Sequence, residues 1–193
     1  MYKVKYTNLR LRTDNFQIAQ ILNKRFDYNI LVLSRNGCLN IGNMIRTANL
    51  YGVKRFFIFG KNFTNYTYKY VNIIRINQDF INNTKNKFDP ELFSNIMNKY
   101  NIVPVFIEQS KDAIKLNEFN WNYQFEQIPL NKEICIIMSN DLYGLPTSII
   151  QTKDQFNGSF SIKVPSYNIN NWNDIIINSL FNYNIKKNYD IYL

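Results

Sequence analysis

Apolar runs and amphipathic stretches alternate along this chain and predict strands and helices in turn. Each apolar run is five or six residues long and is bounded by polar residues or Gly, as buried strands are; the runs cover residues 29–33, 55–59, 103–108, 133–138 and 159–164. The stretches between and after them predict helices at residues 40–51, from Asp89, from Pro146 and at residues 172–183. This alternation is typical of an α/β fold with a mostly parallel sheet.

The stretch 40–52, with the sequence NIGNMIRTANLYG, gives the clearest helix. Asn40 is a suitable N-cap, and an apolar face follows at roughly helical spacing, made of Ile41, Met44, Ile45, Ala48 and Leu50. Arg46 and Thr47 are left near the surface. A second helix starts at Asp89-Pro90, where a capping carboxylate precedes Pro at the first helical position.

The remaining stretches carry weaker signals. Residues 1–28 mix charged and apolar groups and are predicted to form a short accessory segment, whereas residues 29–193 form the main domain. Residues 61–89 are rich in Asn, Lys and Tyr and predict a loop with short elements, and residues 109–132 predict a polar connection. With 193 residues the chain is long enough to bury its own core as one domain.

The chain is basic, with 23 Lys and Arg against 14 Asp and Glu, a formal net charge of +9. Such a charge attracts polyanions, and nucleic acid is the usual one; Lys is also a common solvating residue in a chain this rich in Asn and Ile, so charge alone leaves both interpretations open. No apolar run approaches the length of a membrane helix, and residues 1–20 lack the apolar core of a secretory signal. We expect a cytoplasmic protein without a membrane partner, while the basic first residues keep an organellar address open.

Two residue types limit the possible chemistry. The chain has no His, which excludes Ser-His and Cys-His nucleophiles, His-ligated metals and an imidazole base. Its two cysteines, Cys38 and Cys135, are far apart and form no CxxC pair, so neither a disulfide framework nor a zinc site is indicated. Chemistry must therefore depend on Arg, Asp, Glu, Lys, Tyr, Ser, Asn or the backbone, without a metal.

Three polar loops leave predicted strands and are expected at one edge of the sheet. The first leads into the helix at residues 40–51, the second has the sequence SNDLYGLP at residues 139–146, and the third has the sequence VPSYN at residues 164–168. Ligands of open α/β sheets bind at the carboxyl ends of the strands, where these loops begin.

At these loops the sequence resembles the SpoU (TrmH) class of SPOUT methyltransferases. The family's first motif, Asn-x-Gly-x-x-x-Arg-Thr-Ala followed by an aromatic-Gly pair, is matched by Asn40, Gly42, Arg46, Thr47, Ala48, Tyr51 and Gly52. The second is met by Ser139, Asn140, Asp141, Gly144 and Leu145, with Ser in place of Gly and Asp in place of Glu. The third is matched less fully, by residues 164–168 and 171–174.

The resemblance implies a SPOUT-like α/β fold with a C-terminal trefoil knot, a homodimer, and transfer of a methyl group from S-adenosyl-L-methionine to a ribose 2'-oxygen of tRNA or rRNA. It also implies which residues act. Arg46, Asn40 and Asp141 would be catalytic, and the cofactor would be held around Glu108, Ser139, Asn140, Gly144, Val164, Ser166, Asn171 and Asn173.

Arg46 is the residue on which we expect the reaction to depend most. A guanidinium is effectively always protonated, so positioning a phosphate or stabilising negative charge on a ribose oxygen suits it better than acting as a base. Two alternatives stay open. One is a catalytically inactive RNA-binding relative that has lost cofactor binding, and the other is an α/β interaction protein without this chemistry.

Overall fold

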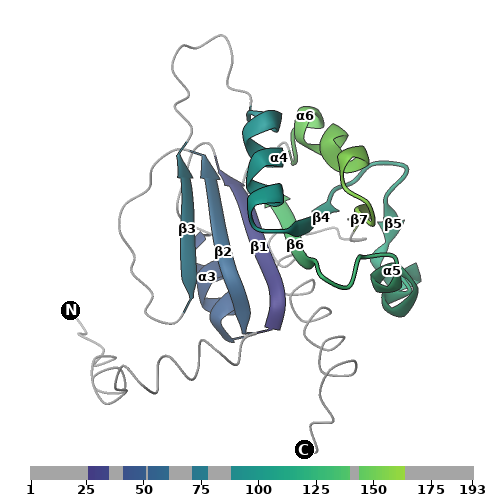
Figure 1. The fold of residues 1–193 in the computed structure, drawn as a ribbon, viewed down its shortest axis with the longest axis horizontal. Helices are drawn as coiled ribbons and strands as arrows, with labels where there is room; N and C mark the ends of the chain where they lie inside the picture. The colour runs from purple at the N-terminus through teal and green to yellow at the C-terminus, as the bar shows by residue number, and fades with distance from the viewer. Residues whose placement is uncertain are drawn as a thin grey trace, which may run out of the picture.

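The computed structural model describes residues 26–34, 41–50, 52–60, 71–77, 88–139 and 144–163. Within these residues seven strands form one sheet in the order β3-β2-β1-β6-β4-β7-β5, and all neighbours pair in parallel (Figure 1). The strands are β1 (Phe26–Ser34), β2 (Val53–Gly60), β3 (Asn72–Asn77), β4 (Ile102–Ile107), β5 (Ile114–Lys115), β6 (Glu133–Ser139) and β7 (Phe160–Lys163). The predicted α/β fold with a parallel sheet is confirmed.

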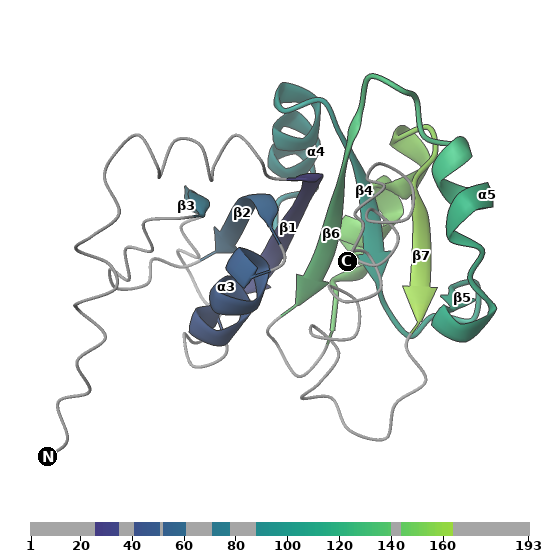
Figure 2. The same ribbon diagram turned by 90° about the horizontal axis from the view of Figure 1, so that it is seen from below.

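Helices cover both faces of this sheet, with α3 (Ile41–Leu50) and α4 (Pro90–Lys99) on opposite sides (Figure 2). The α4 face also holds α6 (Thr147–Ile150) and the 3₁₀ helix η2 (Gln151–Gln155). Beside the edge strand β5 lie the 3₁₀ helix η1 (Leu116–Glu118) and α5 (Trp121–Glu126), and the neighbouring Phe119 and Ile128 join the core on the α3 face.

Strand β1 shows how the sequence divides between two cores, because successive side chains of a strand point to opposite faces. Ile30 and Val32 pack on the α3 face, whereas Leu31 and Leu33 pack on the α4 face. The predicted apolar face of α3 is confirmed for the side chains that the structure describes: Ile41, Met44, Ile45 and Ala48 are all buried. Such continuous apolar strands are expected where helices cover both faces of a parallel sheet.

The start of α4 follows the prediction from the Asp-Pro pair. One carboxylate oxygen of Asp89 accepts hydrogen bonds from the backbone N–H groups of Glu91 and Leu92, at 2.9 and 3.1 Å. These bonds satisfy two of the N–H groups that the first helical turn leaves without partners. The helix buries Phe93 and Met97 against the sheet.

Several predicted boundaries change in the structure. Strand β1 begins at Phe26, three residues before the predicted strand. The stretch predicted as a loop with short elements at residues 61–89 contains one such element, the edge strand β3, and the polar connection predicted at residues 109–132 contains β5, η1 and α5. The predicted helix at residues 172–183, the trefoil knot and most of the accessory segment at residues 1–28 lie outside the described residues.

Candidate active site

Four neighbouring strands, β1, β6, β4 and β7, end at the same edge of the sheet. Their registers pair Leu33 with Ser139, Phe106 with Ile137, and Ile107 with Ile162. Extending these registers to the strand ends aligns three polar residues across β6, β4 and β7: Ser139, Glu108 and Lys163. We call these three residues the polar row.

The direction in which connections cross the sheet changes between β1 and β6, although the two strands are parallel. The connection after β1 leads to α3 on one face of the sheet, and β6 is followed by α6 on the opposite face. Neighbouring strands whose connections leave toward opposite faces leave a crevice at their carboxyl ends, which is where open α/β sheets bind ligands. The polar row begins at this position, so the fold presents it to a ligand.

Glu108 and Gly144 lie at this edge with distinct backbone roles. The N–H of Glu108 donates to the carbonyl of Ile162 at 3.0 Å and so belongs to the sheet, which leaves the side chain and the carbonyl of Glu108 for other partners. Gly144 has φ of +72°, a conformation that L-residues with side chains rarely adopt, and a Cβ there would meet nothing within 4 Å. Backbone angle rather than crowding therefore accounts for Gly144.

Arg46 lies on the exposed side of α3, opposite the helix face buried on the sheet. No described residue forms a hydrogen bond or an ion pair with its guanidinium, which is therefore available to an anion. Arg46 is five residues beyond Ile41, or about 8 Å along the helix axis. The described residues show no contact between Arg46 and the polar row.

The other predicted site residues fall outside the described part of the chain: Asn40, Asn140, Asp141, Val164, Ser166, Asn171 and Asn173. Three of these are bonded to described residues at the carboxyl edge or at the start of α3, since Asn40 precedes Ile41, Asn140 follows Ser139 and Val164 follows Lys163. Their proposed roles stay predictions.

Sequence reasoning missed two polar residues of β7, Lys163 and Ser161. The ammonium of Lys163 donates to the carbonyls of Ser110 and Lys111, at 3.5 and 3.3 Å. The hydroxyl of Ser161 is buried and has no hydrogen-bond partner within the described residues. In the sequence both residues stand in an ordinary alternating strand, FSIK, so only the register with β4 reveals their positions.

At the opposite, amino edge of the sheet, an acidic residue is fully paired. Glu133 accepts hydrogen bonds from Lys54 Nζ at 2.5 Å, Arg55 Nη1 at 2.6 Å and Asn29 Nδ2 at 2.9 Å. Burial alone raises the pKa of Glu133, but these hydrogen bonds and the charges of Arg55 and Lys54 outweigh burial and lower the pKa below its ordinary value. The Arg55 guanidinium also lies 5.4 Å from the ring centroid of Tyr100.

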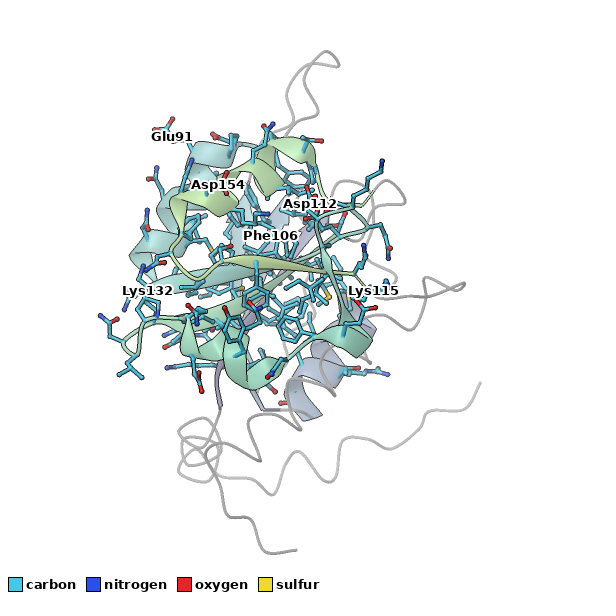
Figure 3. The ribbon with its side chains drawn as sticks, turned by 90° about the vertical axis from the view of Figure 1, so that its right-hand side faces the viewer. Glu91, Phe106, Asp112, Lys115, Lys132 and Asp154 are labelled. Atoms are coloured by element: carbon cyan, nitrogen blue, oxygen red, sulfur yellow. The ribbon has the colours of Figure 1, made fainter. Side chains whose placement is uncertain are left out.

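Cys135 lies next to Glu133 on β6, inside the core. Burial, together with the negative charge of Glu133, raises the pKa of the Cys135 thiol well above its ordinary value. The reactive form of cysteine is the thiolate, so Cys135 is a packing residue and not a nucleophile. Figure 3 separates the two edges: Lys132, just before β6, lies on one side, and Asp112 and Lys115, after β4, lie on the other.

Several solved structures share this fold. The chain is similar to the A. aeolicus TrmH/SpoU tRNA modifying enzyme, with a TM-score of 0.63 and 15% sequence identity over 89% of this chain and 83% of that one. The chain therefore has the SpoU methyltransferase fold. This confirms the resemblance seen in the motifs at the level of the fold.

Two further structures with this fold contain AdoMet. They are an rRNA methyltransferase from Sinorhizobium meliloti (TM-score 0.55, 16% identity, covering 81% of this chain and 56% of that one) and the SpoU methyltransferase AviRb from Streptomyces viridochromogenes (TM-score 0.55, 16% identity, covering 90% and 62%). The present chain spans less than two thirds of both proteins. No protein-family model and no curated protein matches its sequence.

Most of the chain's positive charge lies outside the described residues. The described residues hold ten Lys and Arg and nine Asp and Glu, a net +1, which leaves +8 of the chain's +9 for the other residues. Residues 1–25 contribute six Lys and Arg against one Asp. Among the described residues, no group of three or more Cys, Asp or Glu is placed to hold a metal, and no helix is long and apolar enough to cross a membrane.

Proposed function

We propose that this chain is an S-adenosyl-L-methionine-dependent RNA methyltransferase of the SpoU type that modifies a ribose 2'-oxygen. The observation that supports it most is the combination of fold and motif. The chain has the SpoU methyltransferase fold over 89% of its length, and its Arg-Thr-Ala sequence lies on the helix that follows β1. Three solved structures with this fold are described as a tRNA modifying enzyme, an rRNA methyltransferase and a SpoU methyltransferase, and this favours an enzyme over a non-catalytic RNA-binding relative.

The residues at the carboxyl edge fit a cofactor of this kind. The polar row begins at β6, next to the position where the connections of β1 and β6 leave toward opposite faces, and Glu108 in that row is a buried acceptor without a partner among the described residues. S-adenosyl-L-methionine carries hydroxyl and amino donors that need such acceptors, and when bound it supplies an electrophilic methyl group. A metal has no part in the proposal.

Arg46 is the residue that we assign to the RNA. Its exposed guanidinium carries a permanent positive charge, which attracts a phosphate and holds the neighbouring ribose in place. The same charge stabilises negative charge on the 2'-oxygen as its proton leaves. Because the described residues show no contact between Arg46 and the polar row within one chain, we further propose that the protein is a homodimer in which Arg46 and a cofactor site meet across the interface.

The proposal also includes a trefoil knot in the C-terminal residues, a cytoplasmic location, and Asn40 and Asp141 as residues that hold the catalytic loops. Its direct test is transfer of a labelled methyl group from S-adenosyl-L-methionine to unmodified tRNA and rRNA, followed by nucleoside analysis. The expected product is a 2'-O-methylated nucleoside from one of the two RNA classes. A methylated base, or no transfer to either class, would contradict the proposal.

Arg46→Ala tests the assigned role. We expect at least a hundredfold loss of methyl transfer, as when one charge-stabilising donor is removed from an active site, with an unchanged unfolding midpoint. Arg75→Ala is the matched control because Arg75 is an exposed arginine on the edge strand β3. Full activity of the Arg46→Ala protein would remove Arg46 from the mechanism.

A further inference from the structure

Glu108 is the one charged residue in the buried set that the structure describes, with 7% of its surface exposed. Its carboxylate accepts no hydrogen bond from any described residue and pairs with no described cation. Glu133, in contrast, is more exposed and has three hydrogen-bond donors. Buried carboxylates are normally paired because burial without a partner is costly, and within the described residues the Glu108 carboxylate has no donor.

The register shows where this carboxylate lies. Glu108 continues the ladder of β4 with β7 by one residue through its bond to Ile162, so it stands opposite Lys163. Alternation along the strand places Glu108 on the same face as Phe106, which packs in the core beneath α4 and α6. Figure 3 shows Phe106 inside the molecule. Glu108 therefore stands where this core meets the carboxyl edge.

Lys163, the neighbour of Glu108 on β7, limits which kind of donor can bind the Glu108 carboxylate. The Lys163 ammonium is held by the carbonyls of Ser110 and Lys111 and makes no ion pair with Glu108. Ser110 follows Glu108 by only two residues, so the ammonium bound to its carbonyl remains near Glu108. It repels a second cation, such as an ammonium or a sulfonium, and leaves a neutral donor as the better partner.

The ribose of adenosine offers two neutral hydrogen-bond donors, its 2'- and 3'-hydroxyls. Its two neighbouring hydroxyls match the two oxygens of one carboxylate, and backbone N–H groups cannot replace that carboxylate because they only donate. Dinucleotide-binding folds place an acidic residue on a ribose hydroxyl for the same reason. We infer that the Glu108 carboxylate accepts hydrogen bonds from the ribose hydroxyls of the cofactor's adenosine and selects for them. This inference rests on the proposed function, which assigns S-adenosyl-L-methionine to this edge.

The test measures binding by calorimetry on the full chain. The probes are S-adenosylhomocysteine and its 2'-deoxy and 3'-deoxy analogues, and the proteins are the unchanged chain, Glu108→Gln and Glu108→Ala. Glu126→Gln is the control, since Glu126 is an exposed acid at the end of α5. Unfolding curves for each protein confirm that it is folded, and Glu108→Gln keeps the size of the side chain if the Ala variant unfolds.

The unchanged protein is expected to bind each deoxy analogue about 10- to 100-fold more weakly than S-adenosylhomocysteine, as for loss of a hydrogen bond to a charged group. Both Glu108 variants should bind S-adenosylhomocysteine about 10- to 100-fold more weakly than the unchanged protein does. They should also bind S-adenosylhomocysteine and its deoxy analogues with nearly equal affinity, whereas Glu126→Gln should still prefer S-adenosylhomocysteine. If the Glu108 variants still prefer S-adenosylhomocysteine to its deoxy analogues, or bind it as tightly as the unchanged protein does, the inference about Glu108 is overturned and the proposed function is not. If the unchanged protein fails to bind S-adenosylhomocysteine, both the proposed function and this inference are overturned.

Discussion

Replacing Glu133 by Gln tests whether the ion-pair cluster at the amino edge stabilises the fold. One oxygen of Glu133 accepts from Lys54, and the other accepts from Arg55 and Asn29. Gln keeps the shape and one acceptor oxygen but removes the negative charge. The side chains of Lys54 and Arg55, which are 34% and 20% exposed, then lie together without the counter-charge of Glu133.

The size of the effect follows from the exposure of the cluster. A hydrogen bond to a charged group contributes about 1.5–3 kcal/mol when it is well shielded, and exposed ion pairs contribute about 0–1 kcal/mol. The Glu133 side chain is 20% exposed, between these cases, so we expect Glu133→Gln to lower the free energy of unfolding by about 2 kcal/mol at pH 7. With a urea slope of about 2 kcal/mol per molar, the midpoint falls by about 1 M.

Acid provides the refuting measurement. The folded pKa of Glu133 lies below its ordinary value of 4.5, so its stabilisation is fully present above about pH 4.5 and is lost as the pH falls through the folded pKa. The two urea midpoints should therefore converge as the pH falls from 4.5 through the folded pKa. Glu118→Gln is the control, because the exposed pair of Glu118 with Lys115 should contribute less than about 0.5 kcal/mol. Equal midpoints at pH 7, or a gap that persists in acid, would refute the reasoning.

Two further predictions concern single atoms in the sheet, and both are checked by urea unfolding. Gly60→Ala should cost at least about 3 kcal/mol, because φ is +143° and the new Cβ would lie 1.9 Å from the carbonyl oxygen of Ser34, whereas Gly144→Ala meets no atom and should cost about 1–2 kcal/mol. Ser161→Ala should be neutral or stabilising because the hydroxyl has no described partner, whereas Ser159→Ala should cost about 1 kcal/mol by removing the 2.7 Å bond to the Pro104 carbonyl. A tolerated Gly60→Ala, or a larger loss at Ser161 than at Ser159, would contradict these expectations.

The central strands and α4 could be predicted because each carries its signal locally. Strands β4 and β6 are short apolar runs buried on both faces, and α4 begins at an Asp-Pro pair whose capping geometry depends on neighbouring residues only. Strand β3 could not be predicted in the same way. It is an edge strand that exposes Asn72 and Arg75, so its pattern, NIIRIN, resembles the polar loop around it, and its pairing with β2 decides its structure.

The sequence could predict which loops form the candidate site but not how their residues are arranged across the strands. Polar residues after consecutive strands indicated that one edge carries function, and Glu108 and Ser139 do end neighbouring strands there. What the sequence lacks is the strand order. Only the placement of β4 between β6 and β7 sets Glu108 against Lys163. Only three-dimensional packing shows that Lys163 binds carbonyls and that the Glu108 carboxylate has no partner among the described residues.

The position of Arg46 limits what one chain does alone. Helix α3 leaves the carboxyl end of β1 and returns toward the amino end of β2, so each turn carries its residues farther from the polar row. Arg46 stands in its middle and faces solvent, where the proposed function assigns it to an RNA phosphate and not to the cofactor that we propose beside Glu108. A reaction that needs both groups on one ribose therefore requires the exposed side of α3 to approach a polar row from elsewhere. A second copy of the chain, with the same exposed Arg46, satisfies that requirement without any rearrangement of the sheet.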